Sequence, residues 1–459
     1  MALEDRLYPL LSLYERSPQW AKTIVGSCYS LLPQHVRLGR RYGEFCELAQ
    51  SFQTSTPEEI AAWQTGVVRR MLTHAYETCP FYKRHYDDHG VSPKDFTRLS
   101  DITRFPYVEK KHLQDFREEF VSSAVPANQR LLITTGGSTG VPVGFYLQKG
   151  VSRTKEQAFL EAMWKRASWK PQVRMAVIRG HVTKVNKKDS IAAYEATRNW
   201  LILSSSHLDV ENFPDYRKAL EKFRPKHLHA YPSAALMLAE LVAKSGRPLS
   251  FPLTSILCGS ESLPLNQKRI LEEAFQCRIY RWYGHSERVV LAGEGTTSEL
   301  LYFFPQYGYV EFGEADEGGL QEIVGTSFHN FAMPLIRYRT GDLAKVTDGT
   351  EFPWPAVSRI VGRQQEFVVS KTGRKVSLTA INMHDEIFAG LYAVQFFQEK
   401  LGVLDFRYVA GPTFSPAQIP VIERGLLRKL GEGFELTLRA VSETEKTARG
   451  KHRWLVSKI

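Results

Sequence analysis

Apolar positions recur with two different periods along this chain of 459 residues. In the first part they lie three or four positions apart, which is the repeat of an amphipathic helix. The clearest helix follows Thr56, which can cap it, while Pro57 suits its first turn and Glu59 completes a capping box. Its apolar stripe, which we expect to be core, consists of Ile60, Trp63, Val67, Met71 and Ala75, and Pro80 ends it. We therefore expect residues 1–125 to be largely helical.

Short apolar runs alternate with helical patterns over residues 126–362. Residues 174–179, 255–258 and 278–282 are predicted strands, and a helix is predicted over 264–276. This strand–helix–strand order predicts an α/β fold with mostly parallel sheets covered by helices. Further strands are predicted over 131–134, 319–326 and 331–338.

The last hundred residues have a pattern of their own. Residues 393–399 and 404–410 are predicted to pair as a hairpin around Gly402. A helix over 416–430 that stops at Gly431 and Gly433, and a strand over 434–441, complete a small α/β unit. We expect a large N-terminal domain of several subdomains over 1–362 and a small C-terminal lid domain over 363–459, joined by a short hinge.

Composition supports several domains of an ordinary globular protein. The length exceeds one comfortable core, and 43% hydrophobic and 24% charged residues are typical values. The net charge of +11 favours anionic partners, but the basic residues are dispersed, which argues against a nucleic-acid tract. A solvated basic surface remains the simpler interpretation.

Cysteines and the N-terminus indicate a cytoplasmic protein. The five cysteines are scattered and odd in number, which fits reduced thiols and shows no zinc pattern: Cys28, Cys46, Cys79, Cys258 and Cys277. No secretory signal is predicted near Glu4, Asp5 and Arg6. The apolar run over 21–33 is too short to span a bilayer. It either touches a membrane surface weakly or, as we favour, packs as a helix on the main domain.

A loop rich in glycine and hydroxyl groups follows the predicted strand over 131–134. It consists of Thr135, Gly136, Gly137, Ser138, Thr139 and Gly140. Its free backbone N–H groups can surround phosphate oxygens, because glycine lets the backbone approach closely. It is not a Walker A loop, since Val141 follows Gly140, and it lacks the dinucleotide pattern. Taken alone, it is better explained by a plain turn.

Four further segments follow in a fixed order. They are Tyr283-Gly284-His285-Ser286-Glu287, Ile336-Arg337-Tyr338-Arg339-Thr340-Gly341-Asp342, Arg359-Ile360-Val361-Gly362-Arg363-Gln364-Gln365-Glu366 and Thr447-Ala448-Arg449-Gly450-Lys451. With the loop, they resemble the adenylate-forming superfamily of acyl- and aryl-coenzyme A ligases over nearly the whole chain. Residues 74–82 resemble more narrowly the phenylacetate–coenzyme A ligase branch and its relatives in capsule and surface-polysaccharide gene clusters.

The resemblance implies ATP-dependent activation of a carboxylic acid to an acyl-adenylate. The loop would hold the β- and γ-phosphates, and Glu287 would bind Mg²⁺. Asp342 would accept hydrogen bonds from the ribose hydroxyls. Arg363 would lie beside the ribose or α-phosphate, and Lys451 would supply the mobile catalytic cation. Gln365 stands where the family usually has aspartate or lysine at its hinge.

Other residues are expected around the adenine and the acyl group. Those flanking the adenine by resemblance are Gly259, Ser260 and Glu261, and Tyr283 is expected to stack on the purine. Tyr231 and Ser233 would line an acyl pocket suited to an aryl or small polar acid. His285 either touches the carboxylate or is a buried structural histidine.

The acceptor of the acyl group is expected to be coenzyme A. One alternative is transfer to an amine or hydroxyl of a sugar or carrier in polysaccharide biosynthesis. Another is a non-catalytic scaffold with the same fold, which retention of Glu287, Asp342, Arg363 and Lys451 disfavours.

Overall fold

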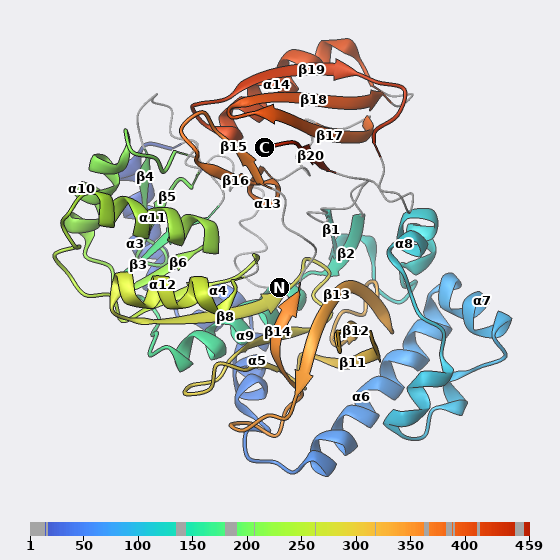
Figure 1. Cartoon of the computed structure of the whole chain (residues 1–459). Coiled ribbons are helices and arrows are strands. Elements are labelled where there is room, and N and C mark those ends of the chain that lie inside the picture. Colours follow the sequence, from blue (N-terminus) through green and yellow to red (C-terminus); the bar gives the residue numbers. More distant parts are fainter. Residues whose placement is uncertain are drawn as a thin grey trace.

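The computed structural model describes a large mixed sheet with helices on both faces and a second, smaller sheet at the C-terminal end (Figure 1). The described residues are 14, 17–134, 144–179, 191–205, 207–261, 263–316, 318–361, 367–381, 388, 391–410, 414–445 and 454–459. Within them, no helix is both long and apolar enough to cross a membrane.

Twelve strands form the large sheet, in the order β11-β12-β13-β14-β10-β9-β8-β7-β6-β3-β5-β4. Their bounds are β3 Met175–Ile178, β4 Ala192–Glu195, β5 Trp200–Leu203, β6 His227–Ala230, β7 Ser255–Cys258, β8 Arg278–Gly284, β9 Leu291–Glu294, β10 Leu301–Phe303, β11 Gly308–Ala315, β12 Gln321–Ser327, β13 Tyr338–Thr347 and β14 Ala356–Val361. Strands β5, β3, β6, β7 and β8 run parallel, and the other neighbours are antiparallel. The α/β class is confirmed, and the sheet is partly parallel.

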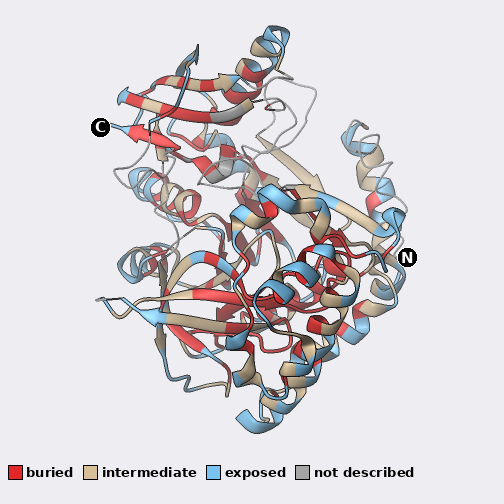
Figure 2. Cartoon of the chain, turned by 90° about the vertical axis from the view of Figure 1, so that its right-hand side faces the viewer, coloured by how far each residue is buried: buried red, intermediate tan, exposed pale blue. Residues whose placement is uncertain are grey.

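Helices sandwich the parallel strands because successive side chains of a strand point to opposite faces. Ala176 and Ile178 of β3 share a core with α10 (Phe213–Phe223), α11 (Pro232–Lys244) and α12 (Leu265–Phe275). Met175 and Val177 share another core with α5 (Arg41–Gln50) and α9 (Ser152–Arg166). The predicted parallel sheet covered by helices is thus present over β3 and β5 to β8. Figure 2 shows that buried residues gather in the interior of the chain and that exposed ones lie on the outer helices.

From residue 17 onward, the described N-terminal residues are largely helical, as predicted. The helices are α3 Gln19–Ser30, α4 Gln34–Leu38, α5, α6 Pro57–Thr78, α7 Pro80–Asp88 and α8 Lys110–Phe116. Helix α6 begins with the predicted capping box of Thr56 and Glu59. Its stripe packs with α7 against the antiparallel strands, and Tyr82 of α7 donates a hydrogen bond to the Pro334 carbonyl at 3.0 Å.

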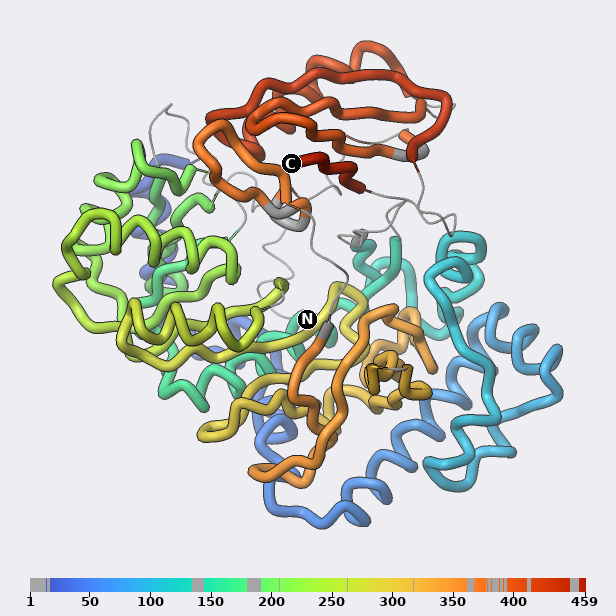
Figure 3. Tube along the Cα trace, in the orientation of Figure 1, coloured from blue at the N-terminus to red at the C-terminus, as the bar shows by residue number. Residues whose placement is uncertain are grey.

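A four-stranded sheet in the order β19-β18-β17-β20 forms the C-terminal part, which lies above the large sheet in Figure 3. Its elements are β17 Leu391–Lys400, β18 Val403–Ala410, α14 Ile419–Leu430, β19 Glu435–Ala440 and β20 Leu455–Ser457, preceded by β15 Phe367–Val369, β16 Lys375–Ser377 and α13 Leu378–Ile381. The predicted hairpin and helix are confirmed, and β20 was not predicted. These elements bury a core of their own.

The strand predicted over 331–338 is wrong. Strand β13 begins only at Tyr338, and the residues before it form a buried loop. Arg337 has a φ of 50°, which interrupts an extended strand, and the Ile336 N–H donates to the Tyr82 hydroxyl at 3.0 Å instead of to a neighbouring strand. The apolar side chains here are buried by the tertiary fold rather than by sheet pairing.

Candidate nucleotide and acyl site

The predicted site residues gather where the parallel strands end. Arg179 follows β3, Tyr231 follows β6, Gly259 follows β7, and Tyr283 and Gly284 close β8. Ligands of open α/β sheets bind outside the carboxyl ends of such strands. The sheet changes from parallel to antiparallel pairing at β8, so this edge also meets β13 of the other half through side chains.

Tyr283 and Asp342 form the central contact. The Tyr283 hydroxyl donates a hydrogen bond to Oδ2 of Asp342 at 2.8 Å, joining β8 to β13. Burial, and then the charge of Asp342, raise the pKa of Tyr283 well above its usual value, so the phenol remains a donor. The two predicted nucleotide-binding residues are therefore brought together, with Tyr283 orienting the carboxylate.

Glu287 lies in the loop after β8, next to this pair. Tyr338, at the start of β13, donates its hydroxyl to Oε1 of Glu287 at 3.0 Å. Among the described residues there is no group of three or more histidines, cysteines or acids able to hold a metal ion. A single half-buried carboxylate suits a magnesium ion whose other ligands are phosphate oxygens and water.

His285 makes a structural contact, and its predicted contact with the carboxylate stays a prediction. Its Nε2 accepts a hydrogen bond from the Val289 N–H at 3.3 Å, which makes Nδ1 the protonated nitrogen. That Nδ1 is buried and has no hydrogen-bond partner in the described part of the chain. The ring therefore has a structural contact and a remaining donor. Ser286, next in sequence, is exposed.

The loop after β7 lies tightly against Trp282. A Cβ on Gly259 would be 2.2 Å from the indole, so only glycine fits there. Ser260 has a φ of 68°, and Glu261 accepts a hydrogen bond from the Ser233 N–H at 2.9 Å through Oε2. Ser233 lies in the first turn of α11, so this bond joins the start of α11 to the loop after β7.

Arg179 is a member of the site that sequence reasoning missed. Its guanidinium carbon lies 4.9 Å from the ring centre of Tyr231 and 5.6 Å from that of Trp282. Nη1 donates to Nε2 of His229 at 2.8 Å, and Nη2 donates to the Ser260 hydroxyl. Its end-of-strand position in the predicted strand 174–179 was the available signal.

The two hydrogen-bond partners described for Arg179, His229 and Ser260, are uncharged. Burial, and then the charge of Arg179, lower the pKa of His229 well below its usual value, so this imidazole is a neutral acceptor. Nε of Arg179 is buried without a hydrogen-bond partner among the described residues. A cation between two aromatic rings, bonded to neutral groups, is suited to an electron-rich ligand.

Three of the predicted elements lie outside the described residues. They are the loop over 135–140, the hinge region with Arg363 and Gln365, and the terminal segment with Lys451. Strands β1 (Arg130–Thr134) and β2 (Gly144–Gln148), on either side of the loop, pair as a hairpin with Thr134 opposite Gly144. The roles of these residues remain predictions.

The arginines of the segment over 336–342 are structural. Buried Arg337 pairs with Glu311 at 2.8 Å and donates to the Thr103 carbonyl at 3.1 Å. Arg339 pairs with Glu322 and with Glu109. Tyr338, which donates to Glu287, and Asp342, which accepts from Tyr283, are the members of the segment that contact the predicted site residues.

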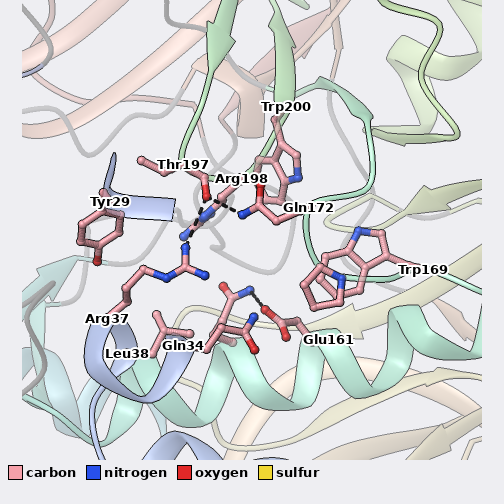
Figure 4. A pocket seen from close by; sticks show the side chains of 12 residues that line it. Tyr29, Gln34, Arg37, Leu38, Glu161, Trp169, Gln172, Thr197, Arg198 and Trp200 are labelled. Atoms are coloured by element: carbon pink, nitrogen blue, oxygen red, sulfur yellow. Dashed lines mark hydrogen bonds between the residues drawn. The ribbon is translucent and has the colours of Figure 1, made fainter. Parts of the chain in front are cut away.

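A small hollow away from this edge is a separate feature (Figure 4). Trp169 and Trp200 line it together with polar groups that largely bind one another. Gln172 donates to the Thr197 carbonyl at 2.9 Å, and Gln157 donates to Glu161 at 2.7 Å. None of the sequence-predicted site residues lines it.

Comparison with solved structures defines the class of fold to which this protein belongs. The crystal structure of a 2-hydroxyisobutyryl-CoA ligase in complex with 2-HIB-AMP and CoA matches with a TM-score of 0.56 and 16% identity. The match covers 88% of this chain and 91% of that one. The chain therefore has the fold of the adenylate-forming ligases.

Curated relatives narrow this class. Protein CapK of Staphylococcus aureus is 23% identical over 83% of this chain and 85% of its own length. Phenylacetate-coenzyme A ligase of Escherichia coli K12 is 27% identical over 73% of this chain and 77% of its own length. No protein-family model matches the chain. These relatives support placing the chain in the phenylacetate–coenzyme A ligase-like branch of the adenylate-forming superfamily.

Proposed function

We propose that this protein is an ATP-dependent ligase that activates a carboxylic acid and then transfers its acyl group, with coenzyme A as the acceptor. The observation that carries the proposal is the Tyr283–Asp342 hydrogen bond beside Glu287, at the carboxyl edge of the parallel strands. Relatives named as coenzyme A ligases, matched over most of the chain, support the same reaction class.

In the first step, a carboxylate oxygen of the acid attacks the α-phosphorus of ATP. The new P–O bond forms as the bond to the bridging oxygen of the β-phosphate breaks, and pyrophosphate leaves with that electron pair. Asp342, oriented by Tyr283, would bind both ribose hydroxyls. Mg²⁺, when bound through Glu287, would supply charge stabilisation to the phosphates.

The elements outside the described residues would complete the nucleotide site. Backbone N–H groups of the loop over 135–140 would hold the β- and γ-phosphates. Arg363 would contact the ribose or α-phosphate, and Lys451 would neutralise charge that develops on the α-phosphate. In the second step, the thiol sulfur of coenzyme A attacks the acyl carbon, its proton is lost, and AMP leaves.

The acid would lie against Tyr231 and Trp282, beside Arg179. The apolar ring faces suit an aryl or short acyl group. The Arg179 cation, held by the neutral His229 and Ser260, favours an acid whose acyl part carries an electron-rich polar group. We therefore expect a substrate more polar than a plain aryl acid.

Residues 363–459 would form the mobile lid. Arg374, before β16, donates to the carbonyls of Leu430 at 2.7 Å and Glu432 at 2.9 Å. Burial lowers its pKa, whereas the nearby charge of Asp209 in the large part opposes that shift. The attraction between these opposite charges in the two parts would favour the arrangement seen here over a rotated one.

The test is an ATP–pyrophosphate exchange assay across a panel of carboxylic acids, followed by product analysis with and without coenzyme A. Exchange that depends on magnesium and on one class of acid is expected, together with a coenzyme A thioester. If the adenylate forms but its acyl group is transferred only to an amine or hydroxyl of a sugar or carrier, that group replaces coenzyme A as the acceptor. Absence of ATP binding would indicate a scaffold and defeat the proposal.

A further inference from the structure

Helix α3 and the start of α4 expose apolar side chains that monomeric proteins seldom leave together in water. Trp20 is 69% exposed, Ile24 57% and Leu31 84%. Their spacing of four and seven positions places them on one side of the helix. Val25, Leu32 and Val36, which lie close by in the sequence, are also exposed. We call these six residues the α3–α4 face.

The opposite side of α3 is attached to the large sheet, which fixes the direction of the face. Gly26 is buried, and a Cβ there would be 2.9 Å from the Cβ of Ala196, so the helix packs closely on the turn after β4. Gln19 donates to the Tyr194 carbonyl of β4 at 2.8 Å. Because one side is held against the protein, the apolar side points outward.

The charged residues in the segment that carries the face are all basic. Residues 17–43 contain four basic residues and no aspartate or glutamate: Lys22, Arg37, Arg40 and Arg41. Arg40 is exposed, and the first acid, Glu44, is paired with Arg41 at 3.6 Å. The chain as a whole carries a net charge of +11. A partner for this surface therefore has to be both apolar and anionic.

We propose that the α3–α4 face docks on the surface of an anionic lipid bilayer. Leucine, isoleucine and tryptophan side chains insert at the boundary of headgroups and acyl chains, and lysine and arginine attract acidic headgroups. At 12 residues, α3 is about 18 Å long and can lie in the interface but cannot span the bilayer. A second copy is a poorer partner, since it would bring like charges together.

Vesicle flotation of the full chain tests the proposal directly. Vesicles of phosphatidylcholine with phosphatidylserine should carry the protein to the top of the gradient, and pure phosphatidylcholine vesicles should not. Binding should weaken as salt is raised, because screening shortens the reach of the basic residues to about 8 Å near physiological ionic strength. These measurements require no enzymatic activity, so they stand apart from the proposed reaction.

Matched variants identify the surface responsible. The pair Ile24→Ser with Leu31→Ser should weaken vesicle binding about tenfold or more, because two inserting side chains are removed. Ile270→Ser is the control, since Ile270 is 53% exposed on another helix, α12, and should leave binding unchanged. The double variant Lys22→Gln with Arg40→Gln should lose the salt dependence.

The depth to which Trp20 inserts into the bilayer can be measured with a variant that keeps an aromatic ring at this position. Brominated lipids should quench the tryptophan fluorescence of bound wild-type protein, and Trp20→Phe should bind but lose most of that quenching. Equal binding of wild type and the Ile24/Leu31 variant, or no binding to anionic vesicles, would overturn the proposal. So would a wild-type dimer on gel filtration that the same variant dissolves, since the face would then be a protein interface.

Discussion

Replacing Asp342 by alanine tests the centre of the proposed nucleotide site. The change removes the carboxylate that accepts from Tyr283 at 2.8 Å and that would accept from the ribose hydroxyls. A hydrogen bond to a charged group contributes about 1.5–3 kcal/mol. Losing the ribose contacts should therefore weaken ATP binding about ten- to a hundred-fold.

Tyr283→Phe is the matched control for this effect. It keeps the carboxylate and the aromatic ring and removes only the hydroxyl that orients Asp342. A loss of about 0.5–1.5 kcal/mol, or about two- to tenfold in ATP affinity, is expected for a bond that positions rather than binds. The two variants should therefore differ clearly in dissociation constant.

Equilibrium binding of ATP by calorimetry provides the measurement, with circular dichroism as the check of folding. An unchanged affinity in folded Asp342→Ala would place the ribose elsewhere and refute the assignment. An equal loss in both variants would mean that Asp342 acts only through its bond to Tyr283.

Lys451→Ala should slow adenylation about a hundred- to a thousand-fold, while ATP binding and acyl transfer from a supplied acyl-adenylate are retained. An equal loss of both half-reactions would contradict the proposed role of Lys451. Arg179→Leu should raise KM for the acid about tenfold or more and leave KM for ATP unchanged, and Arg179→Lys should partly restore the KM for the acid. An equal rise in the KM for ATP would place Arg179 at the nucleotide. Burial, and then the charge of Lys155, lower the pKa of His329 to about 3. Below about pH 6.5 the unfolded chain binds a proton at His329 that the folded chain does not. The free energy of unfolding therefore decreases as the pH is lowered, by about 2 kcal/mol at about pH 5. His329→Asn, which tolerates the φ of 66°, should remove that loss in urea unfolding, and an unchanged loss would contradict the assignment.

Elements with strong local signals could be predicted from the sequence. The capping box of Thr56 and Glu59 starts α6, and the run from β7 through α12 to β8 follows the predicted strand–helix–strand order. The segment before Tyr338 could not be predicted, because its apolar residues are buried by partners far along the chain. Ile336 donates to Tyr82, 254 positions away, and no local pattern carries that contact.

The residues of the candidate site also fall into those that the sequence predicted and those that only the fold brings into the site. Motif resemblance identified Tyr283, Glu287 and Asp342, but the bond between Tyr283 and Asp342 depends on how β9 to β12 fold between them. Arg179 was overlooked because an arginine after a strand ordinarily faces solvent. Its place in the site depends on the rings of Tyr231, which follows β6, and Trp282, which lies in β8.

The packing of α6 and α7 has a consequence for how this protein is made. Their apolar faces share a core with Ile323, Phe328 and Leu335, which are synthesised much later than the helices themselves. Until those residues leave the ribosome, the two helices carry an unburied surface of the kind that chaperones bind and that drives aggregation. Truncated chains that end before residue 289 should therefore accumulate as insoluble protein, even though their parallel strands are complete.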